Sequence, residues 1–243
     1  MRLDVYLYTN GFCDSRSKAQ RIIEESRVAV DGKTISKASF DVDENSKVTV
    51  AQSKETEFVG RGGNKLEHAL NEFSLCVNGK ICLDIGASTG GFTQCLIMNG
   101  AKKVYAVDSG KGQLADILLK DERVVSIEGF NARKLTTDDI DGNLCSCIVM
   151  DVSFISQTLL YPAILRVAEK GADVITLIKP QFEAGRQHIG KNGIVKDEKV
   201  RKKVVENIIE TAEKCGFEYV ALTESPIKGG DGNVEYLLYL KVK

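Results

Sequence analysis

Two lysines and two carboxylates of this sequence could converge in one crevice. Asp151 ends the apolar run in "MDVSFIS", Lys179 follows the run in "LIKPQFE", and Glu235 lies inside the last run, "VEYLLYL". Lys65 lies in a helix expected to begin near Asn64. Each alone could be a solvated residue at a strand end or edge, and for Glu235 alone that interpretation is the better one. As a set they predict a charged site, because such groups carry general acid–base chemistry in enzymes.

A glycine-rich turn follows the strand expected at 81–86. The segment "LDIGASTGGFT" (83–93) lets the backbone approach a ligand closely, although its spacing is not that of the dinucleotide fingerprint. Asp108 closes the next strand, where a carboxylate can accept hydrogen bonds from both ribose hydroxyls. This pattern favours an S-adenosylmethionine site over a tight turn beside a solvated acid. The expected cofactor contacts are Asp84, Gly86, Ala87, Ser88, Thr89, Gly90, Gly91, Phe92, Asp108 and Asp151.

Alternating strands and helices must hold these residues at one edge of a sheet. Apolar strands are expected at 81–86, 103–109, 123–129, 147–153, 173–180, 217–225 and 234–242. Helices are expected near 91–98, 113–119, 158–169 and 198–215. The alternation predicts an α/β fold with a doubly wound, mostly parallel, seven-stranded sheet. Ligands of such sheets collect at the carboxyl ends of the strands. The residues at those ends are Asp84, Asp108, Asp151 and Lys179.

The first fifty or so residues predict a separate unit. Two short amphipathic helices precede "VAVDGKT", which predicts a hairpin that turns at Asp31 and Gly32. Residues 52–57 are polar and predict a linker. The expected organisation is a small α+β binding module with its linker at 1–57 and a larger α/β domain at 58–243.

The composition indicates a soluble globular protein. Of the 243 residues, 43% are hydrophobic and 28% are charged, and no apolar run approaches the roughly 20 residues of a membrane helix. The seven cysteines are dispersed without a CxxC pair, and the start, "MRLD", shows no signal peptide. These features favour reduced thiols in a cytoplasmic protein, away from membranes. His68 and His188 lack partners at metal-ligand spacing, so no metal is predicted. No obligate protein partner is evident.

The sequence resembles the TlyA family over nearly its full length. The matching motifs are "SRSKAQRII", "VAVDGK", "GRGGNKL", "LDIGASTGGFT", "DVSFIS", "KPQFEAG" and "GGDGNVEYLLYL". In that family an RNA-binding module similar to ribosomal protein S4 precedes a methyltransferase domain of the FtsJ/RrmJ type. The residues that match the K-D-K-E tetrad of this domain are Lys65, Asp151, Lys179 and Glu235. Ser88 and Thr89 stand where the FtsJ branch usually carries a proline, which points to the TlyA branch.

The resemblance implies a class I, Rossmann-like methyltransferase that transfers a methyl group from S-adenosyl-L-methionine to a ribose 2′-hydroxyl of ribosomal RNA. Its leading target is a cytidine of large-subunit (23S) RNA, and a start at "MRLDVYL" favours the type that modifies the large subunit only. The partner is free ribosomal RNA or a ribosomal subunit. The tetrad would be catalytic, with Lys179 orienting the hydroxyl or acting as its general base.

Two other functions are open to the same sequence. A haemolysin, a name sometimes attached to this family, should show a secretion signal or an amphipathic membrane segment, and neither is visible. A non-catalytic RNA-binding protein should have lost the tetrad, which is present. Because the net charge is only −1, RNA contact must rely on local positive charge. The expected RNA-binding residues are Arg2, Arg16, Lys18, Arg21, Arg186 and Lys191.

Overall fold

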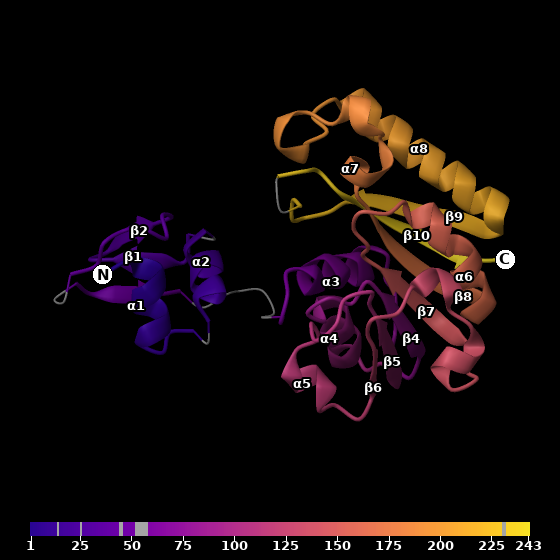
Figure 1. Ribbon diagram of the computed structural model, residues 1–243, viewed down its shortest axis with the longest axis horizontal. Helices are drawn as coiled ribbons and strands as arrows, with labels where there is room; N and C mark the ends of the chain where they lie inside the picture. Colours follow the sequence, from indigo (N-terminus) through magenta and orange to yellow (C-terminus); the bar gives the residue numbers. More distant parts are fainter. Residues whose placement is uncertain (14, 25, 44–45, 52–57, 230–231) are drawn as a thin grey trace. The chain divides into compact units, whose positions relative to one another are not determined.

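The protein is described by a computed structural model, which covers residues 1–243 except 14, 25, 44–45, 52–57 and 230–231. The side chains of residues 17, 21 and 191 also lie outside the described part. The linker predicted at 52–57 falls in one of these gaps. The chain divides into two compact units, Met1–Glu57 and Phe58–Lys243 (Figure 1).

The first unit packs two helices against a small antiparallel sheet. Its elements are α1 (Leu3–Thr9), α2 (Arg16–Glu24), β1 (Val28–Val30), β2 (Lys33–Ile35) and β3 (Val48–Val50). Asp31 and Gly32 join β1 to β2 with positive φ angles of 50° and 78°, which is the geometry of the predicted tight hairpin. The apolar faces of these elements meet in one core. Its buried residues are Leu3, Leu7, Ala19, Ile22, Ile23, Val28, Val30 and Val42.

A buried carboxylate ties the two helices of this unit together. Asp4 in α1 has no exposed surface, and it accepts hydrogen bonds of 2.9 to 3.1 Å from Arg2, Arg16 and Gln20. The hydrogen bonds from Arg2 and Arg16 hold the pKa of Asp4 well below its usual value. The side chains of Arg2 and Arg16 remain 49% and 53% exposed. Two arginines that the sequence marks for RNA contact therefore also have a structural role.

The second unit combines one large sheet with helices on both of its faces. Its helices are α3 (Gly62–Glu72), α4 (Gly91–Met98), α5 (Asp116–Leu119), α6 (Tyr161–Val167), α7 (Pro180–Glu183) and α8 (Glu198–Cys215). Its strands are β4 (Ile81–Ile85), β5 (Lys103–Val107), β6 (Val124–Ile127), β7 (Cys145–Met150), β8 (Ala168–Ile178), β9 (Phe217–Glu224) and β10 (Tyr236–Val242). Within the described residues, no helix is both long and apolar enough to cross a membrane.

The sheet of the second unit is parallel except for one strand. Across the described residues the strand order is β6-β5-β4-β7-β8-β10-β9, and the pairs from β6 to β8 are parallel. Strand β10 is antiparallel to both β8 and β9. The direction of winding reverses between β4 and β7, which is where doubly wound sheets bind ligands. The predicted α/β fold with a seven-stranded sheet is confirmed.

Neighbouring residues of a strand point into two different cores. Helices α6 and α8 cover one face of the sheet, where they pack against side chains such as Val174 and Leu238. Helices α3 and α4 cover the other face, which presents Ile175 and Leu237 (Figure 1). Because both faces are buried, the strands read as continuous apolar runs rather than as alternating patterns.

Several element boundaries differ from the sequence prediction. The helix expected at 158–169 is a 3-10 turn followed by the shorter α6, and β8 starts already at Ala168, which pairs with Cys145 ahead of a bulge. The helix expected at 113–119 begins only at Asp116, because the carboxylate of Glu128 binds the backbone N–H groups just before it. These differences move the ends of elements and leave the predicted seven-stranded, mostly parallel sheet unchanged.

We predict that Asp4→Ala loosens the first unit and leaves the second intact. The substitution removes an acceptor of four hydrogen bonds and should lower the free energy of unfolding of the first unit by about 1–3 kcal/mol. Hydrogen exchange followed by mass spectrometry should show faster exchange in α1 and α2 and unchanged exchange in the second unit. Equal exchange in variant and wild type would contradict the role of Asp4.

Candidate active site

Two adjoining crevices open at the carboxyl ends of the parallel strands. The first, of about 410 Å³, has mainly apolar walls around the carboxylate of Asp108. The second, of about 300 Å³, is more polar and is lined by all four residues of the predicted tetrad. The crevices share part of their lining, so they meet at one point. The shared residues are Gly86, Ser88, Asp151 and Ser153.

The tetrad forms two ion pairs inside the second crevice. Lys65 Nζ lies 2.5 Å from Glu235 Oε2, and only 9% and 2% of these side chains are exposed. Lys179 Nζ lies 2.6 Å from Asp151 Oδ1, with 13% and 20% of the side chains exposed. Lys179 Nζ also donates a hydrogen bond to Ser153 Oγ at 2.9 Å. Each nearly buried ammonium group therefore has its own carboxylate, as its removal from water requires.

The direction of β10 brings Glu235 to this site. Strands β7 and β8 deliver Asp151 and Lys179 at their carboxyl ends, and the antiparallel β10 starts at the same edge of the sheet. Glu235 directly precedes β10 rather than lying inside it, which corrects the sequence prediction. On the β8 side the ladder ends at the pair of Tyr236 with Ile178, and α7 begins at Pro180 shortly after.

Glycines allow the helix that carries Lys65 to pack against the glycine-rich turn. A Cβ at Gly91 would lie 2.8 Å from the backbone nitrogen of Gly63 and 2.9 Å from the carbonyl oxygen of Gly60. A Cβ at Gly86, whose φ is 86°, would lie 2.4 Å from the carbonyl oxygen of Asp151. All three distances are too short for a real side chain. The glycines of "GRGGNKL" and "GASTGG" therefore shape the site through contacts within the chain.

Asp108 has the geometry expected of a ribose-binding acid. It directly follows β5, and its Oδ2 and Oδ1 atoms accept hydrogen bonds from the backbone N–H groups of Ser88 at 2.8 Å and Gly110 at 2.7 Å. These bonds fix the carboxylate and leave each oxygen able to accept a second donor. Apolar walls suited to a purine ring surround it in the first crevice. The residues present therefore fit a cofactor that contains adenosine, such as S-adenosylmethionine.

Asp84 lies behind the glycine-rich turn instead of lining a crevice. It sits inside β4, is fully buried, and accepts a hydrogen bond from Thr93 Oγ1 at 2.7 Å. Its Oδ1 atom has no hydrogen-bond partner among the described residues. Burial, with further help from the charges of Asp151 and Asp108, raises the pKa of Asp84 to about 7. The sequence analysis places Asp84 at the end of a strand. In the structure it lies inside β4 and contacts α4.

Side chains that the sequence analysis missed complete the mouth of the site. Phe154 is 91% exposed and has a φ of 63°, which is uncommon outside glycine. Its ring centroid lies 5.0 Å from that of Phe182. Nearby, the carboxylate of Glu183 accepts a hydrogen bond from the backbone N–H of Gln157 at 2.9 Å. These contacts fasten the segment after β7 to the turn after β8. The sequence signal for Phe154 is an apolar residue just past the strand-end acid of "DVSFIS".

The other predicted site residues occupy different positions. The remaining expected cofactor contacts that line the second crevice are Ala87, Ser88, Thr89, Gly91 and Phe92. Gly90 lines neither crevice and packs against Leu118. Among the predicted RNA-binding residues, Arg186 is exposed, Lys18 is partly exposed in α2, and the side chains of Arg21 and Lys191 lie outside the described part. The assignment of these residues to RNA stays a prediction.

Each of the two parts of the chain matches a known protein family. A family model described as FtsJ-like methyltransferase matches residues 58–242, and a model of the S4 domain matches residues 1–48. The chain belongs to the FtsJ-like methyltransferase family. The two crevices and all four tetrad residues lie within the part that this family matches.

Relatives of similar length share both parts. The chain is 47% identical to "Hemolysin A" of Brachyspira hyodysenteriae, over 98% of this chain and 99% of the relative. It is 40% identical to "16S/23S rRNA (cytidine-2'-O)-methyltransferase TlyA" of Mycobacterium tuberculosis, over 100% of this chain and 90% of the relative. A solved structure of a candidate haemolysin from Streptococcus thermophilus matches with a TM-score of 0.80 at 41% identity, over 100% of this chain and 88% of that chain. The resemblance to the TlyA family is confirmed.

We predict that Asp84→Asn stabilises the protein in a pH-dependent way. Because folding raises the pKa of Asp84 from 3.8 to about 7, ionisation of this group disfavours the folded state as pH rises through that range. The penalty is absent below about pH 4 and complete above about pH 7, where it reaches at most about 4 kcal/mol. Asparagine has no such penalty and can still accept the hydrogen bond from Thr93.

The measurement is denaturant unfolding of variant and wild type, without cofactor, at several pH values from 4.5 to 8. The difference in the free energy of unfolding should move in favour of Asp84→Asn as pH rises and level off near neutrality. Asp138→Asn, at an exposed acid outside both crevices, serves as the control. A difference that does not change with pH would show that Asp84 does not titrate in this range.

Proposed function

We propose that this protein transfers the methyl group of S-adenosylmethionine to a ribose 2′-hydroxyl of ribosomal RNA in the cytoplasm. The observation that carries the proposal is the pair of lysine–carboxylate contacts in the second crevice, one of which includes Asp151 at the junction with the first crevice. We further propose a cytidine of large-subunit RNA as the target, and the cytidine-2′-O-methyltransferase of Mycobacterium tuberculosis named above supports a cytidine. A protein that only bound RNA would have no need of nearly buried lysines beside a second crevice.

The cofactor would occupy the first crevice, with Asp108 accepting hydrogen bonds from its ribose. When bound, S-adenosylmethionine supplies a methyl group on a positively charged sulfur, which makes that methyl electrophilic. The glycine-rich turn at 86–91 would allow the backbone to approach it closely. The remaining task of the chain is to hold a hydroxyl oxygen in line with the methyl carbon, and such alignment supplies much of the rate.

Lys179 is the residue best placed to orient the ribose hydroxyl. Its ammonium group lies at the junction of the crevices, where Ser153 and Asp151 already fix it. The hydroxyl oxygen forms the new bond to the methyl carbon, and its proton passes to a base in the same crevice. Pro180 and the bond from Glu183 to the segment after β7 keep the backbone of Lys179 rigid. The Lys65–Glu235 pair supports this arrangement from α3.

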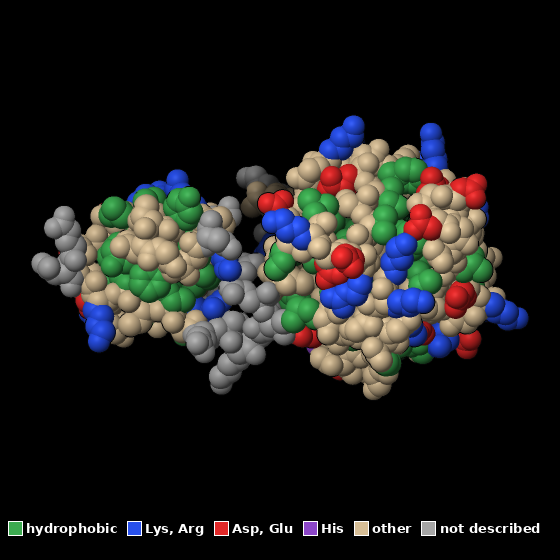
Figure 2. Space-filling view, turned by 90° about the horizontal axis from the view of Figure 1, so that it is seen from below, with side chains coloured by type: hydrophobic (Ala, Val, Ile, Leu, Met, Phe, Trp, Pro, Cys, Tyr) green, Lys and Arg blue, Asp and Glu red, His purple; other side chains and the backbone are tan. Residues whose placement is uncertain are grey.

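Two features support RNA as the substrate. Phe154 offers an exposed ring beside the tetrad, and exposed aromatic rings stack with unpaired bases. The first unit matches an S4 domain. On the face seen in Figure 2, positive and negative side chains of the second unit are interspersed, so that face has no broad field of one sign. On that face, individual contacts rather than a broad positive field would hold RNA.

We predict that Asp108→Ala weakens binding of S-adenosylmethionine by about 1–3 kcal/mol, because the ribose hydroxyls lose their acceptor. Isothermal titration calorimetry on the purified protein measures this change. Asp138→Ala, which removes an exposed acid outside both crevices, should bind like the wild type. If Asp108→Ala bound with unchanged affinity, Asp108 would have no place in the cofactor site.

We predict that Lys179→Ala lowers the rate of methyl transfer by about 10²–10⁴-fold with near-normal folding and cofactor affinity. Lys179→Arg should recover little, because a planar guanidinium differs in size and shape from the ammonium group that Asp151 and Ser153 hold in place. The measurement is single-turnover transfer of labelled methyl to ribosomal RNA, with folding checked by circular dichroism. A folded Lys179→Ala protein with a near-normal rate would exclude Lys179 from the reaction.

A further inference from the structure

One positive side chain in the catalytic crevice has no partner among the residues that the structure describes. Lys65 and Lys179 are each neutralised by a carboxylate, so the tetrad has no net charge. Arg61 lines the same crevice and is exposed, and no hydrogen bond or ion pair joins it to any residue that the structure describes. The crevice therefore holds one positive charge that no group of the described chain neutralises.

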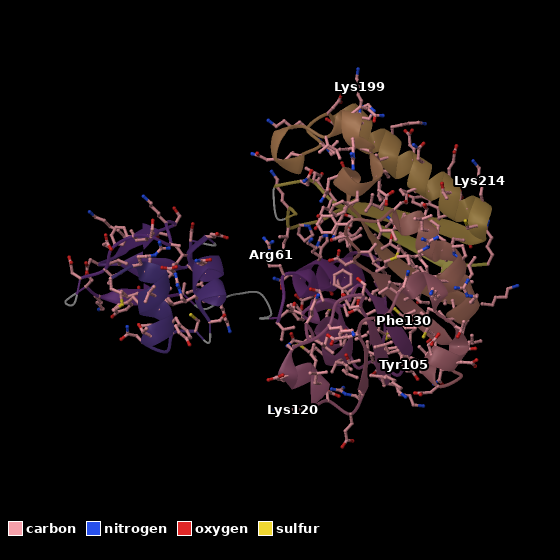
Figure 3. The ribbon with its side chains drawn as sticks, viewed as in Figure 1. Arg61, Tyr105, Lys120, Phe130, Lys199 and Lys214 are labelled. Atoms are coloured by element: carbon pink, nitrogen blue, oxygen red, sulfur yellow. The ribbon has the colours of Figure 1, made fainter. Side chains whose placement is uncertain are left out.

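The backbone that carries Arg61 is held firmly in place. Arg61 directly precedes α3, and Figure 3 shows it at the edge of the second unit, where that helix begins. The backbone N–H of Gly63 donates to the carbonyl of Gly60 at 3.1 Å, so the chain closes a tight turn around Arg61. The close approach of Gly91 to this turn fixes it against the start of α4. A guanidinium on such a support can take up a fixed ligand with little loss of backbone entropy.

The chemistry of the proposed substrate identifies the group that Arg61 would bind. A ribose inside an RNA chain whose 2′-hydroxyl becomes methylated carries a phosphodiester on the neighbouring 3′ carbon, so every such substrate brings a negative charge close to the reacting oxygen. A guanidinium presents paired N–H donors that match the oxygens of a phosphate. We propose that Arg61 binds the phosphodiester next to the target ribose. This inference rests on the proposed function and adds the group that sets the position of the RNA backbone in the site.

Such a contact exists both before and during methyl transfer, so its loss should weaken RNA binding more than it slows the chemical step. We expect Arg61→Gln to raise the KM for ribosomal RNA about tenfold with kcat within a few-fold of wild type. The slope of log affinity against log salt concentration should decrease by about one, as expected for one lost phosphate contact. Arg61→Lys, which keeps the charge, should restore the salt slope and part of the affinity.

The control is Lys214→Ala, which also removes one positive charge. Lys214 lies in the last turn of α8, lines neither crevice and is 75% exposed (Figure 3). This variant should keep the wild-type KM and salt slope. Calorimetry with S-adenosylmethionine, which reports folding of the site independently of RNA, should give the same affinity for all variants.

Three results would overturn the proposal for Arg61. An unchanged KM and salt slope in Arg61→Gln would show that it contacts no phosphate. A lower kcat with unchanged RNA affinity would place it in the chemical step instead. Weaker cofactor binding would assign it to the carboxylate of the cofactor. Failure of the proposed function is a separate result, since it would appear as absent ribose methylation by the wild-type protein.

Discussion

The site depends on the need to neutralise two lysines that lie almost out of water. An unpaired ammonium group in such surroundings would cost several kcal/mol, so each lysine requires a carboxylate at contact distance. The pair formed by Lys179 and Asp151 comes from the ends of two neighbouring parallel strands. The pair formed by Lys65 and Glu235 joins a helix to the start of the only antiparallel strand of the described sheet. The sheet topology thereby determines the charge balance of the crevice.

The same topology joins the charged crevice to one suited to a nucleoside. Gly86 has room for no side chain because the carbonyl of Asp151 lies against it, so the turn after β4 and the acid after β7 are in contact. Asp108, just after the next strand, is fixed by the backbone N–H groups of Ser88 in this turn and of Gly110. A methyl donor and a hydroxyl acceptor can therefore meet where the crevices join. The segment after β7 and the turn after β8 are joined by the hydrogen bond from the backbone N–H of Gln157 to Glu183.

The sequence predicts the fold and the tetrad well because both follow from patterns that extend over many residues. Apolar runs specify the strands. Asp151 and Lys179 follow two of these runs directly, which places both at the edge of the sheet formed by the carboxyl ends of the strands. Glu235 taken alone resembles a solvated edge-strand residue, because its place in the site depends on β10 running antiparallel, which the apolar pattern does not specify. Phe154 and Arg61 escaped prediction for another reason. Exposure of an aromatic ring and the absence of an ionic partner depend on tertiary packing, which no local pattern encodes.

The central claim is that this crevice methylates a ribose hydroxyl and not a base, and alkaline hydrolysis of the product tests it directly. Alkali cleaves RNA through the free 2′-hydroxyl beside each phosphodiester, so a 2′-O-methyl group blocks cleavage at that nucleotide. Ribosomal RNA treated with the purified protein and labelled S-adenosylmethionine should gain an alkali-resistant position, with the label in its ribose. Label in a base within an alkali-sensitive sequence, or no label at all, would contradict the account.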